Sequence, residues 1–138
     1  MTSELFWLLL TAVLAASLWM PYIIGINTTN FEGKEDIFVR LPDQRKMEPW
    51  VQRSYRAHLN LLEQFLPFAV LVIIAQLLKV STPITVWCAF LFFWLRVAHA
   101  IGMISGLARL PLRPLLYVAG WLVTIVFAWQ ILAHAPHV

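Results

Sequence analysis

The sequence has 138 residues, of which 61% are hydrophobic and only 12% charged, and its net charge is +3. This composition excludes an ordinary soluble domain, in which about a quarter of the residues are charged, and it favours a membrane protein. The basic residues flank apolar runs instead of lining a soluble face, so nucleic acid is not expected as a partner. Cys88 is the single cysteine, which excludes an intrachain disulfide.

Four apolar segments are long enough to cross the hydrocarbon core of a bilayer, which takes about 20 helical residues. The predicted helices span residues 5–26, 50–79, 83–107 and 112–133, and a loop spans 27–49. The N-terminus lacks the positive region of a secretory signal, so we expect the first segment to be retained. The predicted fold class for residues 1–138 is therefore all-α, a single four-helix transmembrane bundle.

Basic residues are distributed unevenly among the three predicted connections. The second connection holds only Lys79. The first connection, the start of the second helix and the third connection together hold Lys34, Arg40, Arg45, Lys46, Arg53, Arg56, Arg109 and Arg113. By the positive-inside tendency, connections one and three are predicted to be cytoplasmic, with both termini on the opposite side. The first connection is long for a compact bundle, which indicates a lid or a ligand-contacting segment.

Prolines predict where the helices begin and bend. Pro21, within Trp19-Met20-Pro21-Tyr22, predicts a kink near the end of the first helix. Pro49 is a favourable residue for the first turn of the second helix. Pro67 lies inside that helix and predicts a second kink, which would widen the space beside the polar residues that precede it.

A polar stripe enters the second apolar segment, in the run RAHLNLLEQFLPF from Arg56 to Phe68. Ionisable groups at such a depth face a bundle interior or a watery cavity, so they are candidates for a functional site. On an ideal helix of about 100° per residue, His58 points away from an arc of about 100° that holds the other polar residues. That arc contains Arg53, Arg56, Asn60, Glu63 and Gln64.

The third helix contains Arg96 and His99, which lie three residues apart and so share a face. A guanidinium within an apolar span needs a partner, and Glu63 is the expected one, because the two helices are antiparallel neighbours. A purely structural pair of Arg96 with Glu63 is the alternative interpretation.

The arginines, Asn60 and Glu63 suit a small anionic ligand that also carries amide and amine groups. Arginine binds carboxylates in bidentate fashion, a glutamate can hold an ammonium group, and an asparagine can pair with a peptide amide. Simpler roles remain open at single positions: Arg53 as an interfacial residue, Arg109 as a contact to lipid headgroups, and His58 as a packing residue. The four histidines lack metal-ligand spacing, so no metal site is predicted.

The run RAHLNLLEQFLPF closely resembles the second-helix motif of the MAPEG family, the membrane-associated proteins in eicosanoid and glutathione metabolism, and especially the microsomal glutathione transferases. The four spans, the chain length and an arginine opening the last helix fit as well. The resemblance implies a homotrimer that holds glutathione between adjacent subunits near the cytoplasmic face. A lipophilic electrophile or lipid would arrive from the bilayer, as in detoxification.

The resemblance also implies roles for particular residues. Arg56, Asn60 and Glu63 match glutathione contacts of one subunit, His58 matches a contact to the neighbour's ligand, and Arg96 matches an arginine of the microsomal transferases. With Arg53 and Gln64 from the stripe, the predicted glutathione-binding residues are Arg53, Arg56, His58, Asn60, Glu63, Gln64 and Arg96. Arg113, or alternatively Arg109, matches the arginine near the glutathione sulfur, which would favour the nucleophilic thiolate.

This chain departs from the leukotriene-forming members of the family, which carry paired arginines at the end of the first helix and tyrosines in the third. Residues 23–26 carry no charge and the third helix has no tyrosine, so a leukotriene synthase is not expected. The carboxylates of glutathione would need Arg40, Arg45 or Lys46 instead. The predicted function is a membrane glutathione transferase or peroxidase, and the alternative is a non-catalytic lipid-binding member of the family. A small multidrug exporter is disfavoured, because the first helix lacks a buried glutamate within 5–26.

Overall fold

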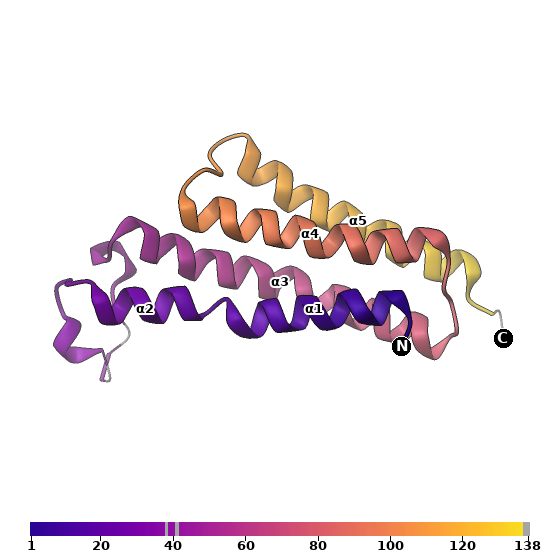
Figure 1. The fold of residues 1–138 in the computed structure, drawn as a ribbon, viewed down its shortest axis with the longest axis horizontal. Coiled ribbons are helices and arrows are strands. Elements are labelled where there is room, and N and C mark those ends of the chain that lie inside the picture. The colour runs from indigo at the N-terminus through magenta and orange to yellow at the C-terminus, as the bar shows by residue number, and fades with distance from the viewer. Residues whose placement is uncertain (38, 41, 137–138) are drawn as a thin grey trace.

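The first apolar segment folds as two consecutive helices. In the computed structural model, which describes residues 1–37, 39–40 and 42–136, α1 spans Ser3–Ser17 and α2 spans Met20–Thr28. Pro21 lies in the first turn of α2, where its missing N–H is not needed. The structure has a short break between α1 and α2 beside Pro21, but the two helices stay nearly collinear, so the helix is interrupted there without a sharp bend (Figure 1).

Three long helices follow a loop that contains two 3-10 turns. The turns are η1 (Lys34–Asp36) and η2 (Gln44–Lys46), and the helices are α3 (Pro49–Leu77), α4 (Pro83–Ser105) and α5 (Leu112–His134). Their bounds agree with the predicted spans to within two residues, and the described residues contain no strand. The fold is therefore all-helical, as the composition predicts.

Local chemistry defines both ends of α4. At its start, Thr82 and Thr85 form a reciprocal cap: the Thr82 Oγ1 accepts from the Thr85 N–H at 3.1 Å, and the Thr85 Oγ1 accepts from the Thr82 N–H at 2.9 Å. At its end, Gly106 adopts a left-handed conformation with a φ of 80°, which glycine tolerates best.

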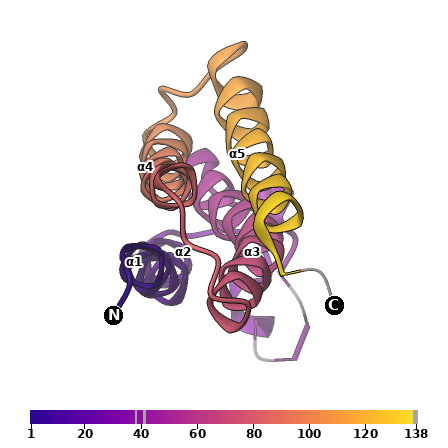
Figure 2. The same ribbon diagram turned by 90° about the vertical axis from the view of Figure 1, so that its right-hand side faces the viewer.

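Successive long helices run in opposite directions along the bundle, so each connection lies at one of its two ends. The loop before α3 and the connection between α4 and α5 lie at one end, and both termini lie at the other with the connection between α3 and α4 (Figure 1). Viewed along the bundle, α4 packs against α1, α3 and α5, while α1 and α5 lie on opposite sides (Figure 2). The two connections rich in basic residues therefore share one end of the molecule.

Aromatic packing forms the core between α3, α4 and α5. The rings of Phe68 and Phe92 stack with centroids 3.9 Å apart and planes 7° apart, and Phe127 meets Phe68 edge-on at 5.4 Å. All three side chains are fully buried. Burial of a large aromatic side chain contributes about 1.5–3 kcal/mol, so this cluster ties the three helices together.

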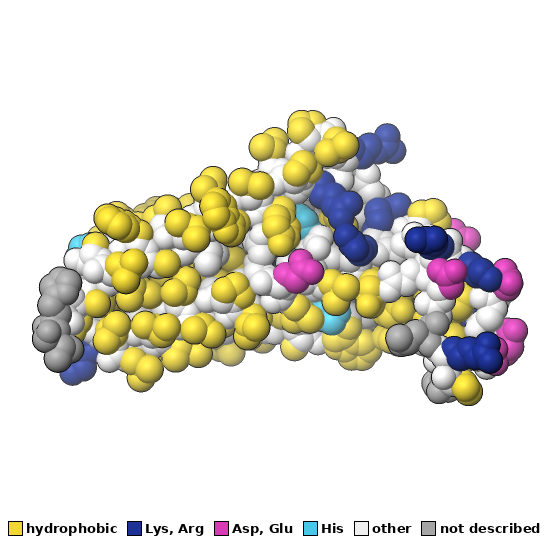
Figure 3. Space-filling model, turned by 180° about the vertical axis from the view of Figure 1, so that it is seen from behind, with side chains coloured by type: hydrophobic (Ala, Val, Ile, Leu, Met, Phe, Trp, Pro, Cys, Tyr) yellow, Lys and Arg dark blue, Asp and Glu magenta, His cyan; other side chains and the backbone are white. Residues whose placement is uncertain are grey.

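The outer surface of the bundle is apolar over most of its length. Trp87, Trp121 and Trp129 point outward and are more than half exposed. Charged side chains gather instead at the end that carries the two basic connections (Figure 3). In the part of the chain that the structure describes, four segments, with α1 and α2 counted as one, are long and apolar enough to cross a membrane, which fits a multi-pass integral membrane protein.

Candidate functional site

Two cavities meet at Arg113, at the charged end of the bundle. The first has a volume of about 430 Å³, and we call it the Glu63 cavity. It is lined by Asn60, Glu63, His99, Leu110, Arg113, Pro114, Tyr117 and Val118. The second has a volume of about 500 Å³, and we call it the arginine cavity. It is lined by Gln44, Arg45, Pro49, Gln52, Arg53, Arg56, Met103 and Arg113.

The Glu63 cavity combines an acid, an amide and a histidine. Glu63 is exposed on α3, and its Oε2 accepts a hydrogen bond of 3.4 Å from the hydroxyl of Tyr117 on α5. Asn60 lies one turn before Glu63 and is half-buried. His99 comes from α4 and is 2% exposed, and its Nε2 has no hydrogen-bond partner within the described part of the chain. These groups can pair with an amine and an amide of a ligand.

The arginine cavity carries a concentrated positive charge. Arg45, Arg53, Arg56 and Arg113 line it, and among the described residues no carboxylate does. Arg53 is half-buried, and its Nη2 donates to the carbonyl of Ile104 at the end of α4, 3.4 Å away. Four guanidinium groups around one space favour an anionic ligand with carboxylate or phosphate oxygens.

Arg113 and Arg109, the two candidates for the arginine near the glutathione sulfur, have different positions in the structure. Arg113 opens α5 in its first turn and is half-buried between the two cavities. Arg109 is exposed in the preceding connection and lines neither cavity. Of the two, Arg113 is therefore the one that a ligand in either cavity would meet.

The predicted pairing of Arg96 with Glu63 is wrong. Arg96 is 1% exposed, and its Nη2 donates to the carbonyl of Leu116 on α5, 2.8 Å away. Its Cζ also lies 5.7 Å from the ring centroid of Phe92 and 5.9 Å from that of Tyr117. The guanidinium reaches α5 because Gly120 has no side chain there, and a Cβ added at Gly120 would lie 2.9 Å from the Arg96 Cζ.

Gln64 also departs from the polar stripe. It is buried, and its Nε2 donates to the carbonyl of Tyr117 at 2.9 Å. Neither Gln64 nor Arg96 lines the two cavities. Both instead hold consecutive backbone carbonyls of α5, one turn after Arg113. In this structure they support the wall of the site.

His58 lies apart from the other polar residues of α3. It is half-buried and lines neither cavity. The structure thus brings Asn60, Glu63 and Arg113 together at one cavity, and Arg53, Arg56 and Arg113 at the other. The separate position of His58 agrees with its position on the helical wheel.

Several residues of the site were not predicted from the sequence. Tyr117 follows Arg113 by four residues and so shares its face of α5, a signal that helical spacing could have provided. Gln52 lies on α3 one residue before Arg53, and Gln44 lies in η2. His99 was recognised only as a neighbour of Arg96. Nothing in the local sequence marks Gln44, because loop residues reach a site only through the tertiary fold.

The described residues thus form four helical segments capable of crossing a membrane, with a polar site at one end, which fits a polytopic membrane protein of the all-helical class. The chain belongs to the MAPEG family, whose family model matches residues 5–133. It is also similar to the prostaglandin E synthases of Homo sapiens and Macaca fascicularis, with 35% identity to each over 95 residues. The aligned region covers 68% of this chain and 61% of each relative. The chain therefore spans less than two thirds of the length of these relatives.

Proposed function

We propose that this protein is a glutathione transferase or peroxidase of the membrane, with glutathione as co-substrate in the two cavities. The observation that carries the proposal is the meeting of Asn60, Glu63 and Arg113 around one cavity, which joins two residues of the second-helix motif to the arginine at the start of α5. The lipophilic electrophile would arrive from the bilayer.

Each part of glutathione finds a suitable group at the site. Glu63 can hold the ammonium group, Asn60 can pair with a peptide amide, and arginines can bind the carboxylates. Arg113 lines both cavities and would lie beside the thiol, which stands between the two ends of the tripeptide. Arg96 and Gln64, which were predicted to bind glutathione directly, act in this proposal by holding α5 behind Arg113.

Arg113 would make the thiol reactive. A free thiol has a pKa of about 8.5, and a neighbouring guanidinium lowers the pKa of such a thiol because it favours the thiolate. The thiolate then forms a carbon–sulfur bond with the electrophile, and the leaving group departs with the bonding electron pair. With a lipid hydroperoxide, two glutathiones would be oxidised to the disulfide while the hydroperoxide is reduced to an alcohol and water.

The substitution Arg113→Ala tests this proposal. We expect it to abolish the thiolate absorbance that appears on adding glutathione, and to lower the conjugation rate with a generic aromatic electrophile about a hundredfold. Arg109→Ala, which removes the same charge outside both cavities, should leave both measurements near the wild-type values. An unchanged rate in Arg113→Ala protein would contradict the assignment.

Synthesis of prostaglandin E is a second candidate, favoured by the 35% identity to the two synthases. Both reactions would use the same thiolate, so they differ in the lipid substrate. Offering the purified protein the cyclic endoperoxide precursor and an aromatic electrophile in parallel distinguishes them. Product from the endoperoxide alone would replace the transferase assignment with the synthase.

A non-catalytic, lipid-binding protein of the same family is the third candidate. It predicts that adding glutathione produces no thiolate absorbance, even though labelled lipid binds the protein. The ultraviolet difference spectrum is a direct readout, because it does not depend on the choice of electrophile.

The proposal includes an assembly and an orientation. The protein would form a homotrimer in which His58 contacts the ligand of the neighbouring subunit. The loop before α3 and the connection between α4 and α5 would be cytoplasmic, because these connections and the first turns of the helices that follow them carry eight of the ten lysines and arginines. Cysteines introduced at Glu35 and Arg109 in a Cys88→Ser background should react with an impermeant maleimide from that side only.

A further inference from the structure

A carboxylate is buried at the end of the bundle opposite the candidate site. Glu4 lies in the first turn of α1 and is 1% exposed. Its Oε1 accepts hydrogen bonds of 2.7 Å from the hydroxyls of Ser81 and Thr85, at the start of α4. Its Oε2 is also buried, and it has no hydrogen-bond partner among the described residues. A buried polar atom in this state indicates an ion or a water as its partner.

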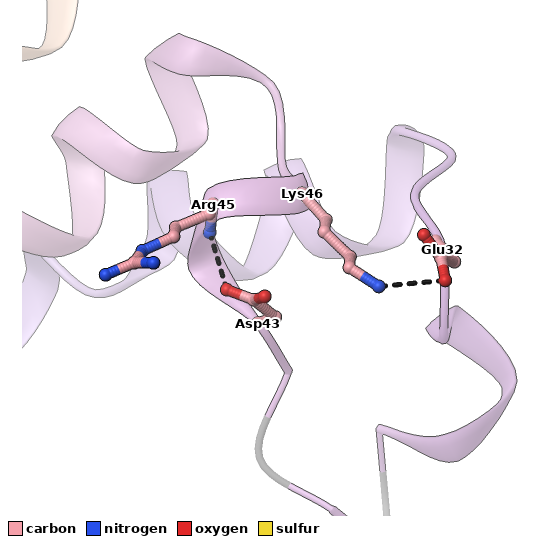
Figure 4. A network of polar contacts seen from close by, with 4 residues as sticks. All are labelled: Glu32, Asp43, Arg45 and Lys46. Carbon is pink, nitrogen blue, oxygen red and sulfur yellow. Dashed lines mark hydrogen bonds and ion pairs between the residues drawn. The ribbon is translucent and has the colours of Figure 1, made fainter.

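The protein supplies no cation for this carboxylate within the described residues. Their only ion pair joins the Lys46 Nζ to the Glu32 Oε1 at 2.8 Å, in the loop at the other end of the bundle (Figure 4). That hydrogen bond raises the pKa of Lys46 and so keeps the exposed pair charged. At Glu4, the two hydroxyls and the positive end of α4 offset only part of the cost of burying a negative charge. An ionised Glu4 therefore needs a counter-charge from outside the described residues.

The polar groups that contact Glu4, and those next to them, offer oxygen atoms. The Thr85 Oγ1 lies 2.8 Å from the Thr82 carbonyl oxygen, and the Thr82 Oγ1 lies 3.2 Å from the Gln130 Oε1 of α5. Oxygen ligands suit hard cations, and a single carboxylate matches a single positive charge. Among the described residues, no group of three or more histidine, cysteine or acidic side chains could hold a metal, so a transition metal is not expected at Glu4.

We propose that the Glu4 Oε2 is the principal ligand of a small monovalent cation such as sodium, bound between α1 and the start of α4 with the Ser81 and Thr85 hydroxyl oxygens as further ligands. The cation supplies both a partner for Oε2 and the balancing positive charge. Protonation of Glu4 would remove the charge, but it would place a hydrogen-bond donor on an atom that has no acceptor among the described residues. Ser81 is exposed, so the site lies one side chain below the surface and a cation can enter there.

Thermal unfolding of the full chain in detergent tests the cation site. The protein is compared in sodium chloride and in N-methylglucamine chloride at equal ionic strength, because the organic cation is too large for a buried site. We expect sodium to raise the Tm of the wild-type protein by about 4 °C, since an ion that binds only the folded state shifts the equilibrium towards it. Glu4→Gln keeps the shape of the side chain without its charge and should abolish this difference. Glu35→Gln removes the charge of an exposed acid instead and should keep it.

Calorimetric titration of the wild-type protein with sodium chloride does not depend on how well a variant folds, and in N-methylglucamine buffer we expect saturable binding. The absence of saturable binding would overturn the inference, and so would a sodium-dependent Tm that persists in Glu4→Gln protein. An infrared carbonyl band of a protonated carboxylic acid, present in the wild-type protein in sodium and missing from Glu4→Gln, would show that a proton occupies the site instead. None of these results affects the proposed function, which is tested by glutathione binding at the other end of the bundle.

Discussion

At the scale of single residues, the site depends on a glycine as well as on charged side chains. Gly120 leaves room for the Arg96 guanidinium and for the Gln64 amide, whose Oε1 would lie 2.6 Å from an added Cβ. Those two side chains hold the carbonyls of Leu116 and Tyr117. A buried guanidinium without such partners would be costly in an apolar surrounding, so the three positions form one unit.

Gly120→Ala should therefore destabilise the protein by about 1–3 kcal/mol, because the added methyl group forces the Arg96 and Gln64 side chains out of their places. Thermal unfolding in detergent measures the change. Leu115→Ala, on the exposed face of the same helix, is the control and should change stability by about 0.5 kcal/mol or less. Equal stability of the Gly120→Ala and wild-type proteins would show that the pocket is looser than the contacts indicate.

The sequence predicted the position of a side chain correctly where that position depends on the geometry of a single helix. The 100° wheel placed Asn60 and Glu63 on one face and His58 on another, and the structure agrees. The wheel also grouped Gln64 with them, although α5 buries it. The partner of Arg96 could not be predicted from side chains alone, because it is a backbone carbonyl on another helix.

At the scale of elements, a buried carboxylate joins the start of α1 to the start of α4. This contact lies at the end of the bundle opposite the candidate site. Glu4 is 1% exposed, and its Oε1 accepts hydrogen bonds of 2.7 Å from both the Ser81 and the Thr85 hydroxyls. The neighbouring Thr82 Oγ1 donates to the Gln130 Oε1 of α5 at 3.2 Å. One polar cluster thus joins α1, α4 and α5.

Glu4→Ala should lower the free energy of unfolding by about 1–3 kcal/mol, because the Ser81 and Thr85 hydroxyls lose their buried acceptor. A Thr85→Val substitution added to Glu4→Ala should cost less than it does alone, since the interaction is already lost. Glu35→Ala removes an exposed acid and serves as the control. Strictly additive costs would mean that the hydrogen bond contributes nothing to stability.

The helix starts were predictable from the apolar runs and from Pro49, whereas the predicted third helix ran to residue 107, past the left-handed Gly106 that ends α4. The break between α1 and α2 followed from Pro21. The two 3-10 turns of the loop were not predicted, since three-residue turns leave no periodic signal. That loop supplies Arg45, so the least predictable element contributes directly to the candidate site.

At the scale of the whole molecule, His58 links the site to the proposed homotrimer. It lies apart from both cavities of its own chain, which suits a residue that serves a neighbour. Suppose that each site combines Glu63 of one subunit with His58 of the next. A trimer that mixes subunits lacking His58 with subunits lacking Glu63 can then contain an intact site, because each kind of subunit still supplies the residue that the other lacks.

Coexpression of His58→Ala and Glu63→Ala subunits tests this arrangement at limiting glutathione. Random assembly leaves about a quarter of the sites with both residues, so activity should exceed that of either variant alone. A mixture of the separately purified variants is the control, because its subunits do not exchange. Activity equal to this control would contradict a site shared between subunits.

The most direct test of the central claim, that these cavities bind glutathione, is calorimetric titration of the detergent-solubilised protein with glutathione. We predict binding to the wild-type protein and to a Glu32→Ala control, and an affinity lower by roughly tenfold or more in Glu63→Ala protein, because the ligand's ammonium loses its charged partner. Binding that is unchanged by Glu63→Ala would place the ligand elsewhere and contradict the account.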